Sequence, residues 1–81
     1  MSWVVYVLRC ADGSLYTGIT NHLARRLAAH RTGTASRYTR ARRPVRLVYQ
    51  ERRRTRSAAL KREAAIKRLP RAAKLTLLHR A

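Results

Sequence analysis

The sequence predicts an α+β fold, in which a small three-stranded and mainly antiparallel sheet is flanked by helices. Two features carry this prediction: an apolar strand pair joined by a tight turn at the start of the chain, and amphipathic helical segments on both sides of a later strand pattern. The predicted order is ββαβαα. Since the chain has only 81 residues, we expect one domain over residues 1–81.

The strand signals lie in three places. Residues 4–9 and 15–19 are expected to form the first hairpin, around a turn at residues 11–14. Residues 45–51 alternate enough to be the third strand. The polar and arginine-rich residues 34–44 between helix and strand are expected to be a loop.

Capping residues and prolines mark the helix ends. The first helix is expected over residues 22–31, with Asn21 as its N-cap and Gly33 just past its end. A second helix begins after a cap and continues to residue 69, and a last one ends near residue 79. The signals for these two helices are a cap at Thr55 or Ser57 and Pro70 in the first turn of the last helix.

The hairpin raises a question about its two tyrosines. A two-residue turn on Asp12 and Gly13 would place Tyr6 and Tyr16 on opposite faces, because side chains alternate along a strand. A three-residue loop with Gly13 in a left-handed conformation would place both tyrosines on one face. The Asp-Gly pair favours the first register, whereas a shared site requires the second. Packing alone also accounts for a tyrosine on a half-buried strand.

Charge is the strongest compositional signal. The chain has 20 Lys and Arg against 3 Asp and Glu, a formal net charge of +17. Self-repulsion on this scale destabilises a compact chain, so it points to a polyanionic partner, with nucleic acid as the first candidate. A membrane surface is disfavoured because only 6% of the residues are aromatic, most of them outside the helical patterns. Most basic residues are arginines, whose forks match phosphate oxygens in pairs.

Location is expected to be cytosolic, with the bacterial cytosol favoured. No apolar run reaches the roughly 18–20 residues of a membrane span. Residues 1–3 lack the charged and apolar regions of a secretory signal. The single cysteine, Cys10, can form neither an internal disulfide nor a cysteine-based zinc site, and we expect it to be a small buried hydrophobe.

Glu63 is the most informative acidic residue. Its neighbours one helical turn away are Ala59, Leu60, Ile66 and Lys67, so its carboxylate lies on or beside the apolar stripe of its helix. An ion pair with an arginine is one explanation. A carboxylate in a phosphate-binding protein also repels the ligand unless a cation lies between them, and Mg²⁺ binds one or two carboxylates together with waters and phosphate oxygens.

Two basic groups complete the candidate residues. Arg26 and His30 are four residues apart and share one face of the first helix, although two solvated polar residues would show the same spacing. Further along, arginines are interleaved with an aromatic residue that could stack on an unpaired base, unless the segment is only a solvated basic loop. The residues predicted to contact nucleic acid are Arg37, Tyr38, Arg40, Arg42, Arg43 and Lys67.

These residues, in this order, resemble the GIY-YIG nuclease superfamily. Val4-Val5-Tyr6 stands at the first motif and Tyr16-Thr17-Gly18 at the second, followed by Arg26, His30 and Glu63. The stretches ASRYTRARRPVRLVY and ALKREAAIKRLPRAAKLTLL are similar to the small bacterial YhbQ-like proteins and, more distantly, to the nuclease domain of Slx-type branched-DNA resolvases. The first motif keeps only its tyrosine, the second lacks its isoleucine, and the asparagine that some members carry after the glutamate helix is absent.

The resemblance implies a metal-dependent DNA endonuclease of repair or recombination, which hydrolyses phosphodiester bonds in single-stranded or branched DNA. It implies Tyr6 as general base or proton relay, with its phenolate favoured by the positive field and a nearby arginine. Tyr16 would contact the scissile phosphate or position the water, and Arg26 would neutralise transition-state charge. His30 would hold a tyrosine or accept its proton, and Glu63 would be the single protein ligand of Mg²⁺ or Mn²⁺. Tyr38 is placed near the site.

Two rival functions stay open. A basic protein that binds nucleic acid without cleaving it would carry the same charge, and a nuclease subunit could require a protein partner. Glu63 discriminates against the first rival, because a pure binder has no reason to keep a carboxylate on its binding side. A monomer or weak dimer is expected.

Overall fold

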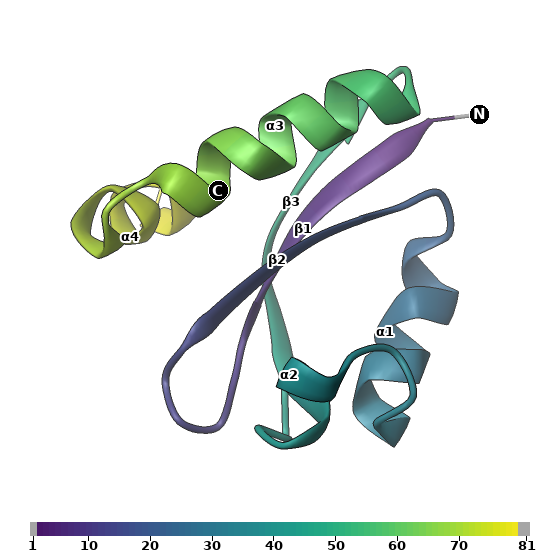
Figure 1. Ribbon diagram of the computed structural model, residues 1–81, viewed down its shortest axis with the longest axis vertical. Coiled ribbons are helices and arrows are strands. Elements are labelled where there is room, and N and C mark those ends of the chain that lie inside the picture. Colours follow the sequence, from purple (N-terminus) through teal and green to yellow (C-terminus); the bar gives the residue numbers. More distant parts are fainter. Residues whose placement is uncertain (1, 80–81) are drawn as a thin grey trace.

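The computed structural model describes residues 2–79 and has an α+β fold built on one antiparallel sheet. In chain order the elements are β1 (Trp3–Arg9), β2 (Leu15–Thr20), α1 (Leu23–Thr32), α2 (Arg37–Arg40), β3 (Arg46–Arg53), α3 (Arg56–Arg68) and α4 (Arg71–His79). The strand order is β2-β1-β3, so β1 is central. α3 and α4 lie on one side of the strands, and α1 and α2 on the other (Figure 1). The predicted fold class is confirmed.

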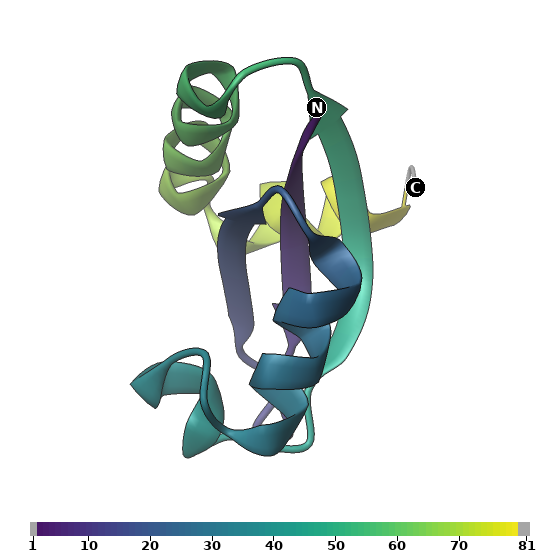
Figure 2. The same ribbon diagram turned by 90° about the vertical axis from the view of Figure 1, so that its right-hand side faces the viewer.

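The central strand is buried on both faces. Residues 5–8 of β1 are buried without a break, and a short continuous apolar run is typical of such a strand. On one face, Val5 and Val7 form an apolar core with Ala59 and Ile66 of α3. The alternate residues of β1 point to the opposite face, which α1 covers in front of the strands (Figure 2). Polar side chains are buried on that second face, and the candidate site lies there.

The hairpin closes on a three-residue loop, the second of the two alternatives, and not on the two-residue turn that the Asp-Gly pair favours. Cys10 donates its N–H to the carbonyl of Ser14, and Gly13 donates to the carbonyl of Cys10, both at 2.9 Å. Gly13 has φ 84°, a conformation that glycine adopts without strain. Asp12 explains the choice, because its carboxylate accepts hydrogen bonds from both the backbone N–H and the hydroxyl of Ser14.

This register places the two tyrosines together. Tyr6 is opposite Gly18, and Leu8 is opposite Tyr16. Because residues two apart on a strand share a face, Tyr6 and Tyr16 point to the same side of the sheet. The register that a shared site requires is therefore the one observed.

The first helix is capped differently from the prediction. His22, not Asn21, is the N-cap of α1, and its Nδ1 accepts a hydrogen bond from the N–H of Arg25 at 3.3 Å. The backbone N–H of His22 in turn donates to the hydroxyl of Thr20 at 3.0 Å. This second bond fixes the direction of the chain between β2 and α1. The preference of N-caps for asparagine does not take such a bond into account, so it predicted the wrong residue.

The expected loop at residues 34–44 contains a short helix, α2. Ser36 caps it, with its hydroxyl accepting the N–H of Thr39 at 3.1 Å. The prediction failed because one helical turn carries too little periodicity to be recognised. Thr55 caps α3, as one of the two predicted alternatives, by accepting the N–H of Ala58 at 3.0 Å.

An ion-pair cluster holds α3 against the sheet. The carboxylate of Glu51 on β3 accepts hydrogen bonds from Tyr49 and from Arg62 of α3, and it pairs with Arg53 at 3.0 Å. Burial opposes the ionised form of Glu51, but the bonds from Tyr49 and Arg62 outweigh it and lower the pKa of this carboxyl. Glu51 therefore has a structural role, and it fixes the position of the helix that carries Glu63.

Candidate active site

A buried hydrogen bond joins the first motif to the first helix. Tyr6 and His30 are both 0% exposed, and the Tyr6 hydroxyl lies 2.8 Å from Nε2 of His30. Arg26, one turn earlier on α1, donates from Nε to the same hydroxyl at 3.5 Å, the long end of the hydrogen-bond range. The spacing of Arg26 and His30 thus brings both side chains to one face of α1 and against the sheet.

The network continues to α2. Nδ1 of His30 lies 2.8 Å from the hydroxyl of Thr39, which is 0% exposed. That hydroxyl is 2.9 Å from the hydroxyl of Ser36 and 3.4 Å from its carbonyl. Sequence reasoning missed Thr39 and Ser36. Their spacing signals a helix cap, but nothing local to them indicates a contact with His30.

Tyr16 and Tyr38 form the aromatic side of the cluster. The ring of Tyr16 meets that of His30 edge to face at 5.2 Å between centroids, and it stacks on Tyr38 at 5.9 Å. The guanidinium of Arg42 lies 3.8 Å from the centroid of Tyr38 and pairs with Asp12 at 3.1 Å. Tyr38 is therefore near the site, as predicted, but its ring already has partners within the protein.

Gly18 is a structural requirement of the site that sequence reasoning left without a role. A Cβ at this position would lie 2.6 Å from the Tyr6 hydroxyl and 2.7 Å from Cζ of its ring. Real side chains do not tolerate such contacts. The glycine of the second motif therefore allows the tyrosine of the first motif to pack closely against β2 at Gly18. A glycine inside a strand is the signal that could have indicated this close approach.

The protonation state of Tyr6 differs from the prediction, and His30 beside it is neutral. Burial raises the pKa of Tyr6, and the charges of Tyr16 and Glu63 add to this, while Arg26 opposes it. The expected phenolate of depressed pKa is therefore wrong, because burial outweighs the positive field. Burial, followed by the charge of Arg26, lowers the pKa of His30. At neutral pH the cluster thus contains a phenol and a neutral imidazole.

Glu63 lies on the inner side of α3, between the buried residues Ala59 and Ile66. Its side chain is only 19% exposed, and Lys67 pairs with it at 3.5 Å. The charge of Glu63 contributes to the raised pKa of Tyr6, so the carboxylate is within electrostatic range of the buried hydroxyl. The predicted position of this carboxylate at the edge of the core is confirmed.

Glu63 suits one kind of metal. Within residues 2–79 the structure has no group of three or more His, Cys, Asp or Glu side chains that could enclose an ion. Zinc in a structural site takes four such ligands, whereas Mg²⁺ keeps several waters and uses one or two carboxylates together with substrate phosphates. A lone carboxylate therefore fits Mg²⁺ or Mn²⁺ better than an enclosed zinc ion, and Glu63 would hold such a cation together with waters.

Comparison with known proteins identifies the family. A family model described as the GIY-YIG catalytic domain matches residues 2–76. The chain belongs to the GIY-YIG family of nuclease domains. It is 55% identical to a UPF0213 protein of Desulfotalea psychrophila over 78 residues, which cover 95% of this chain and 71% of that protein. A UPF0213 protein of Staphylococcus saprophyticus is 49% identical over 74 residues, with 91% and 90% covered.

Solved structures of GIY-YIG relatives have the same architecture. The solution NMR structure of a UPF0213 protein from Bacillus halodurans aligns with a TM-score of 0.64 and 39% identity, covering 98% of this chain and 84% of that one. A protein from E. faecalis, also solved by NMR, has a TM-score of 0.64 and 42% identity, with 95% and 83% covered. The resemblance to the YhbQ-like branch is thus confirmed.

The arginine-rich segment of this GIY-YIG domain contains two kinds of side chain. Arg37 and Arg40 are exposed on α2. Arg43 instead donates to the carbonyls of Arg40 and Arg31, at 3.1 and 3.4 Å, and Arg42 is paired with Asp12. The four arginines of this segment therefore divide into two on α2 that are exposed and two whose guanidinium groups bind other parts of the protein.

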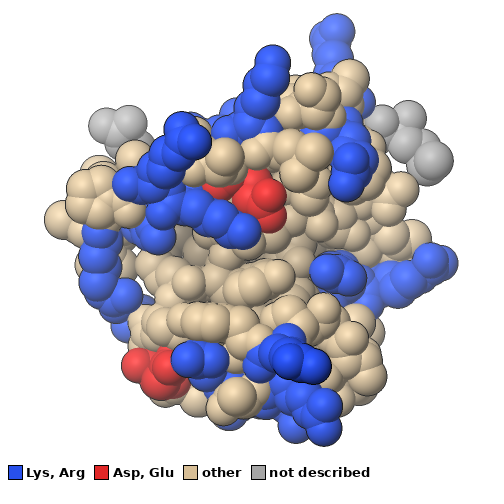
Figure 3. Space-filling view, in the orientation of Figure 1, with Lys and Arg blue, Asp and Glu red and all other residues tan. Residues whose placement is uncertain are grey.

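Basic side chains surround the face seen in Figure 3. Lys and Arg rise from its upper and lower parts, and a hollow of uncharged surface runs between the α3 side and the side of α1 and α2. Acidic atoms border this hollow on the α3 side (Figure 3). Among the helices of residues 2–79, none has the length and apolar character to cross a membrane.

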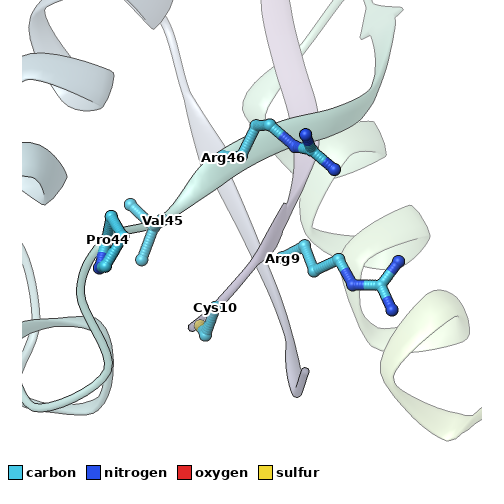
Figure 4. Close-up of a pocket in the computed structure, with 5 residues that line it drawn as sticks. All are labelled: Arg9, Cys10, Pro44, Val45 and Arg46. Atoms are coloured by element: carbon cyan, nitrogen blue, oxygen red, sulfur yellow. The ribbon is translucent and has the colours of Figure 1, made fainter. Parts of the chain in front are cut away.

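A separate pocket shares no residue with the cluster around Tyr6. It is lined by Arg9, Cys10, Pro44, Val45 and Arg46 (Figure 4). Arg9 and Arg46 are directly opposite on β1 and β3, and their guanidinium groups extend to the same side (Figure 4). Cys10 is a free thiol and only 4% exposed, which agrees with the expected small buried hydrophobe. The pocket lies outside the candidate active site.

Proposed function

We propose that this GIY-YIG domain is a metal-dependent endonuclease that hydrolyses phosphodiester bonds in single-stranded or branched DNA, the forms that repair and recombination produce. The observation that carries the proposal is the buried hydrogen bond from Tyr6 to His30, with Arg26 at its edge. Burying a phenol against an imidazole costs more desolvation than an apolar pair of the same size. A protein that only binds nucleic acid gains nothing from this arrangement.

In this proposal Arg26 and Tyr16 contact the scissile phosphate, which their burial supports, because both are half-buried whereas Tyr6 is fully buried. The guanidinium of Arg26 would stabilise the charge that builds on the phosphoryl oxygens, and the Tyr16 hydroxyl would donate a hydrogen bond to one of them. A phosphate would also draw Arg26 away from its long contact with Tyr6. That movement gives an attacking water access to the Tyr6 hydroxyl.

Tyr6 and His30 then move one proton away from the water. The water forms a bond to phosphorus and gives its proton to the Tyr6 oxygen, as the Tyr6 proton passes to Nε2 of His30. The bond to the leaving oxygen breaks, and that oxygen takes a proton from solvent. His30 finally returns its proton to solvent. Tyr6 thus acts as a relay that stays a phenol between turnovers, in keeping with its raised pKa.

Glu63 would hold the divalent cation. When bound, Mg²⁺ or Mn²⁺ supplies charge stabilisation to the phosphoryl and leaving oxygens. Glu63 itself contributes an anionic oxygen whose charge acts on the Tyr6 hydroxyl. In the structure this carboxylate is paired with Lys67. An exposed lysine is a weak partner, since surface ion pairs contribute little stability. The carboxylate can therefore exchange Lys67 for the metal.

Replacing Glu63 by glutamine tests the proposal. Glu63→Gln should lose cleavage by two or more orders of magnitude, because a metal supplies several kcal/mol and each ~1.4 kcal/mol is tenfold in rate. Affinity for DNA should stay unchanged or rise slightly, since a negative charge is removed beside phosphate. The measurements are cleavage of labelled single-stranded, branched and duplex DNA in Mg²⁺, Mn²⁺ or EDTA, DNA affinity, and thermal unfolding.

Glu51→Gln is the matched control, because Glu51 is buried to a similar degree, with 15% of its side chain exposed against 19% for Glu63. This variant should lower the melting temperature while its folded fraction still cleaves. Full cleavage by folded Glu63→Gln would contradict the metal role. Tight binding with no cleavage by the parent protein would favour the non-catalytic binder, unless a protein partner restored activity.

A further inference from the structure

Thr39 contacts His30 through the ring nitrogen that Tyr6 does not use. Its hydroxyl lies 2.8 Å from Nδ1, in a fully buried position. We propose that Thr39 is a positioning residue that keeps His30 in the tautomer with its proton on Nδ1, so that Nε2 is free to accept the proton of Tyr6. This inference rests on the proposed function only for its kinetic test, because its spectroscopic test requires no cleavage.

The direction of the hydrogen bonds follows from burial. A neutral imidazole has one N–H, so Nε2 either accepts from Tyr6 or donates to it. If Nε2 donated, the Tyr6 oxygen would accept from both His30 and Arg26, and its own proton would need another acceptor. Tyr6 is 0% exposed, and its hydroxyl has no third partner among the described residues. An unpaired buried donor is costly, so Tyr6 donates to Nε2 and the imidazole proton is on Nδ1.

The hydrogen bonds of Thr39 and Ser36 are consistent with this direction. Thr39 accepts from Nδ1, and its own hydroxyl proton then needs an acceptor. Ser36 provides two, its hydroxyl oxygen at 2.9 Å and its carbonyl at 3.4 Å. Ser36 is itself fixed as the N-cap of α2, where it accepts the backbone N–H of Thr39. Each of these protons in the chain from Tyr6 to Ser36 therefore has an acceptor.

The arrangement follows the logic of a base oriented by a third group. When the O–H bond of Tyr6 breaks, its electron pair stays on the phenol oxygen and a new N–H bond forms at Nε2. That oxygen takes the proton of the attacking water, so the pair gains one positive charge, which lies on the imidazolium. The imidazolium keeps its Nδ1–H bond to Thr39. A hydroxyl orients the ring without adding the negative charge that a carboxylate would bring, so His30 is a weak base that releases its proton readily.

The first test is spectroscopic and needs no catalytic activity. Long-range ¹H–¹⁵N NMR of the whole protein reports which ring nitrogen of each histidine is protonated. His30 should show a protonated Nδ1 and an unprotonated Nε2, whereas the exposed His22 and His79 serve as internal references. A protonated Nε2 on neutral His30 in the parent protein would overturn the proposal.

The second test compares Thr39→Val with Thr39→Ser. Valine keeps the branched shape and removes the hydroxyl, so kcat should fall by about 10- to 100-fold, the effect of losing the partner that orients a metal-ligating histidine. KM and DNA affinity should not change, and the NMR signature of the Nδ1–H tautomer should disappear. Serine should restore both.

Each outcome of these tests decides one question. A folded Thr39→Val protein with the parent's tautomer and kcat would overturn the positioning role. If the valine variant does not fold, the tautomers of the parent and of Thr39→Ser decide it. If the parent shows the Nδ1–H tautomer but no preparation cleaves DNA, the proposed function fails and the orientation of His30 by Thr39 still holds.

Discussion

Tyr6 shows how burial and net charge compete at a single residue. A net charge of +17 favours every anion in the molecule, yet burial raises the pKa of Tyr6 more than Arg26 lowers it. Low-dielectric surroundings disfavour a phenolate whatever the distant charges are, because those charges are screened by water while desolvation acts locally. The chemistry available to Tyr6 at neutral pH is therefore that of a phenol with a proton acceptor beside it.

The pH dependence of cleavage follows from this pair. His30 accepts a proton only when it is neutral, and burial together with Arg26 moves its pKa below the ordinary value of 6.5. Tyr6, which is hydrogen-bonded to His30, is uncharged in this range because burial raises its pKa, and the ring of Tyr16 meets His30 edge to face. Cleavage should therefore rise with pH through a value below 6.5 and then stay level into mildly alkaline conditions.

A pH–rate profile under single-turnover conditions measures this directly. It should be recorded at saturating metal and constant ionic strength, so that metal binding to Glu63 does not contribute. The rate would instead keep rising toward the ordinary tyrosine pKa of about 10 if a Tyr6 phenolate were the base. Such a rise would contradict the relay from Tyr6 to His30.

At the scale of elements, the close packing of β1 on β2 depends on one missing side chain. Gly18→Ala would place a Cβ 2.6 Å from the Tyr6 hydroxyl, which is fixed between His30 and Arg26 and cannot move without breaking those bonds. Overpacking of this kind typically costs about 1–3 kcal/mol. We therefore expect a lower melting temperature and a loss of cleavage larger than the loss of folded protein.

Gly13→Ala is the control for Gly18→Ala. Position 13 also requires glycine, because its φ is 84°, but no atom lies within 4 Å of a Cβ added there. This variant should lose stability by roughly 1–2 kcal/mol through backbone strain alone, while its folded fraction cleaves normally. Equal specific activity in the two folded variants would show that Gly18 does not position Tyr6.

The elements also show what the sequence can and cannot predict. The strands, α1 and α3 follow from periodicity and caps, which are local, and Glu63 was placed correctly because its helical neighbours are local too. The hairpin register depends on a hydrogen bond that the Asp12 carboxylate accepts from Ser14, and the N-cap on one that the Thr20 hydroxyl accepts from His22. Thr39 meets His30 only through the tertiary fold, so no pattern near either residue predicts the contact.

At the scale of the whole molecule, the net charge indicates a role in binding, because few of the basic side chains are used in ion pairs within the protein. Asp12, Glu51 and Glu63 each pair with a nearby base, and within residues 2–79 these bases are Arg42, Arg53, Arg62 and Lys67. Most of the basic side chains are thus left to interact with solvent and ligands. Salt should therefore weaken DNA binding steeply, by about 0.7 log units for each neutralised phosphate per log unit of salt on single strands.

The last prediction assigns part of that salt dependence to α2. Arg37 and Arg40 are exposed there, so replacing both by alanine should reduce the salt slope by about 0.7 for each phosphate that the variant no longer neutralises. The control is the double variant Arg52→Ala, Arg54→Ala, which removes the same charge. These two residues are exposed and lie at the C-terminal end of β3 and just after it, whereas α2 precedes the start of β3. Affinity measured by fluorescence anisotropy over a salt series should separate the two pairs, since a change in net charge alone would alter both slopes equally.

Arg42 and Arg43 are unsuitable for this test, because their guanidinium groups hold Asp12 and the carbonyls of Arg31 and Arg40. Equal slopes for the two double variants would mean that α2 makes no specific contact with the DNA backbone.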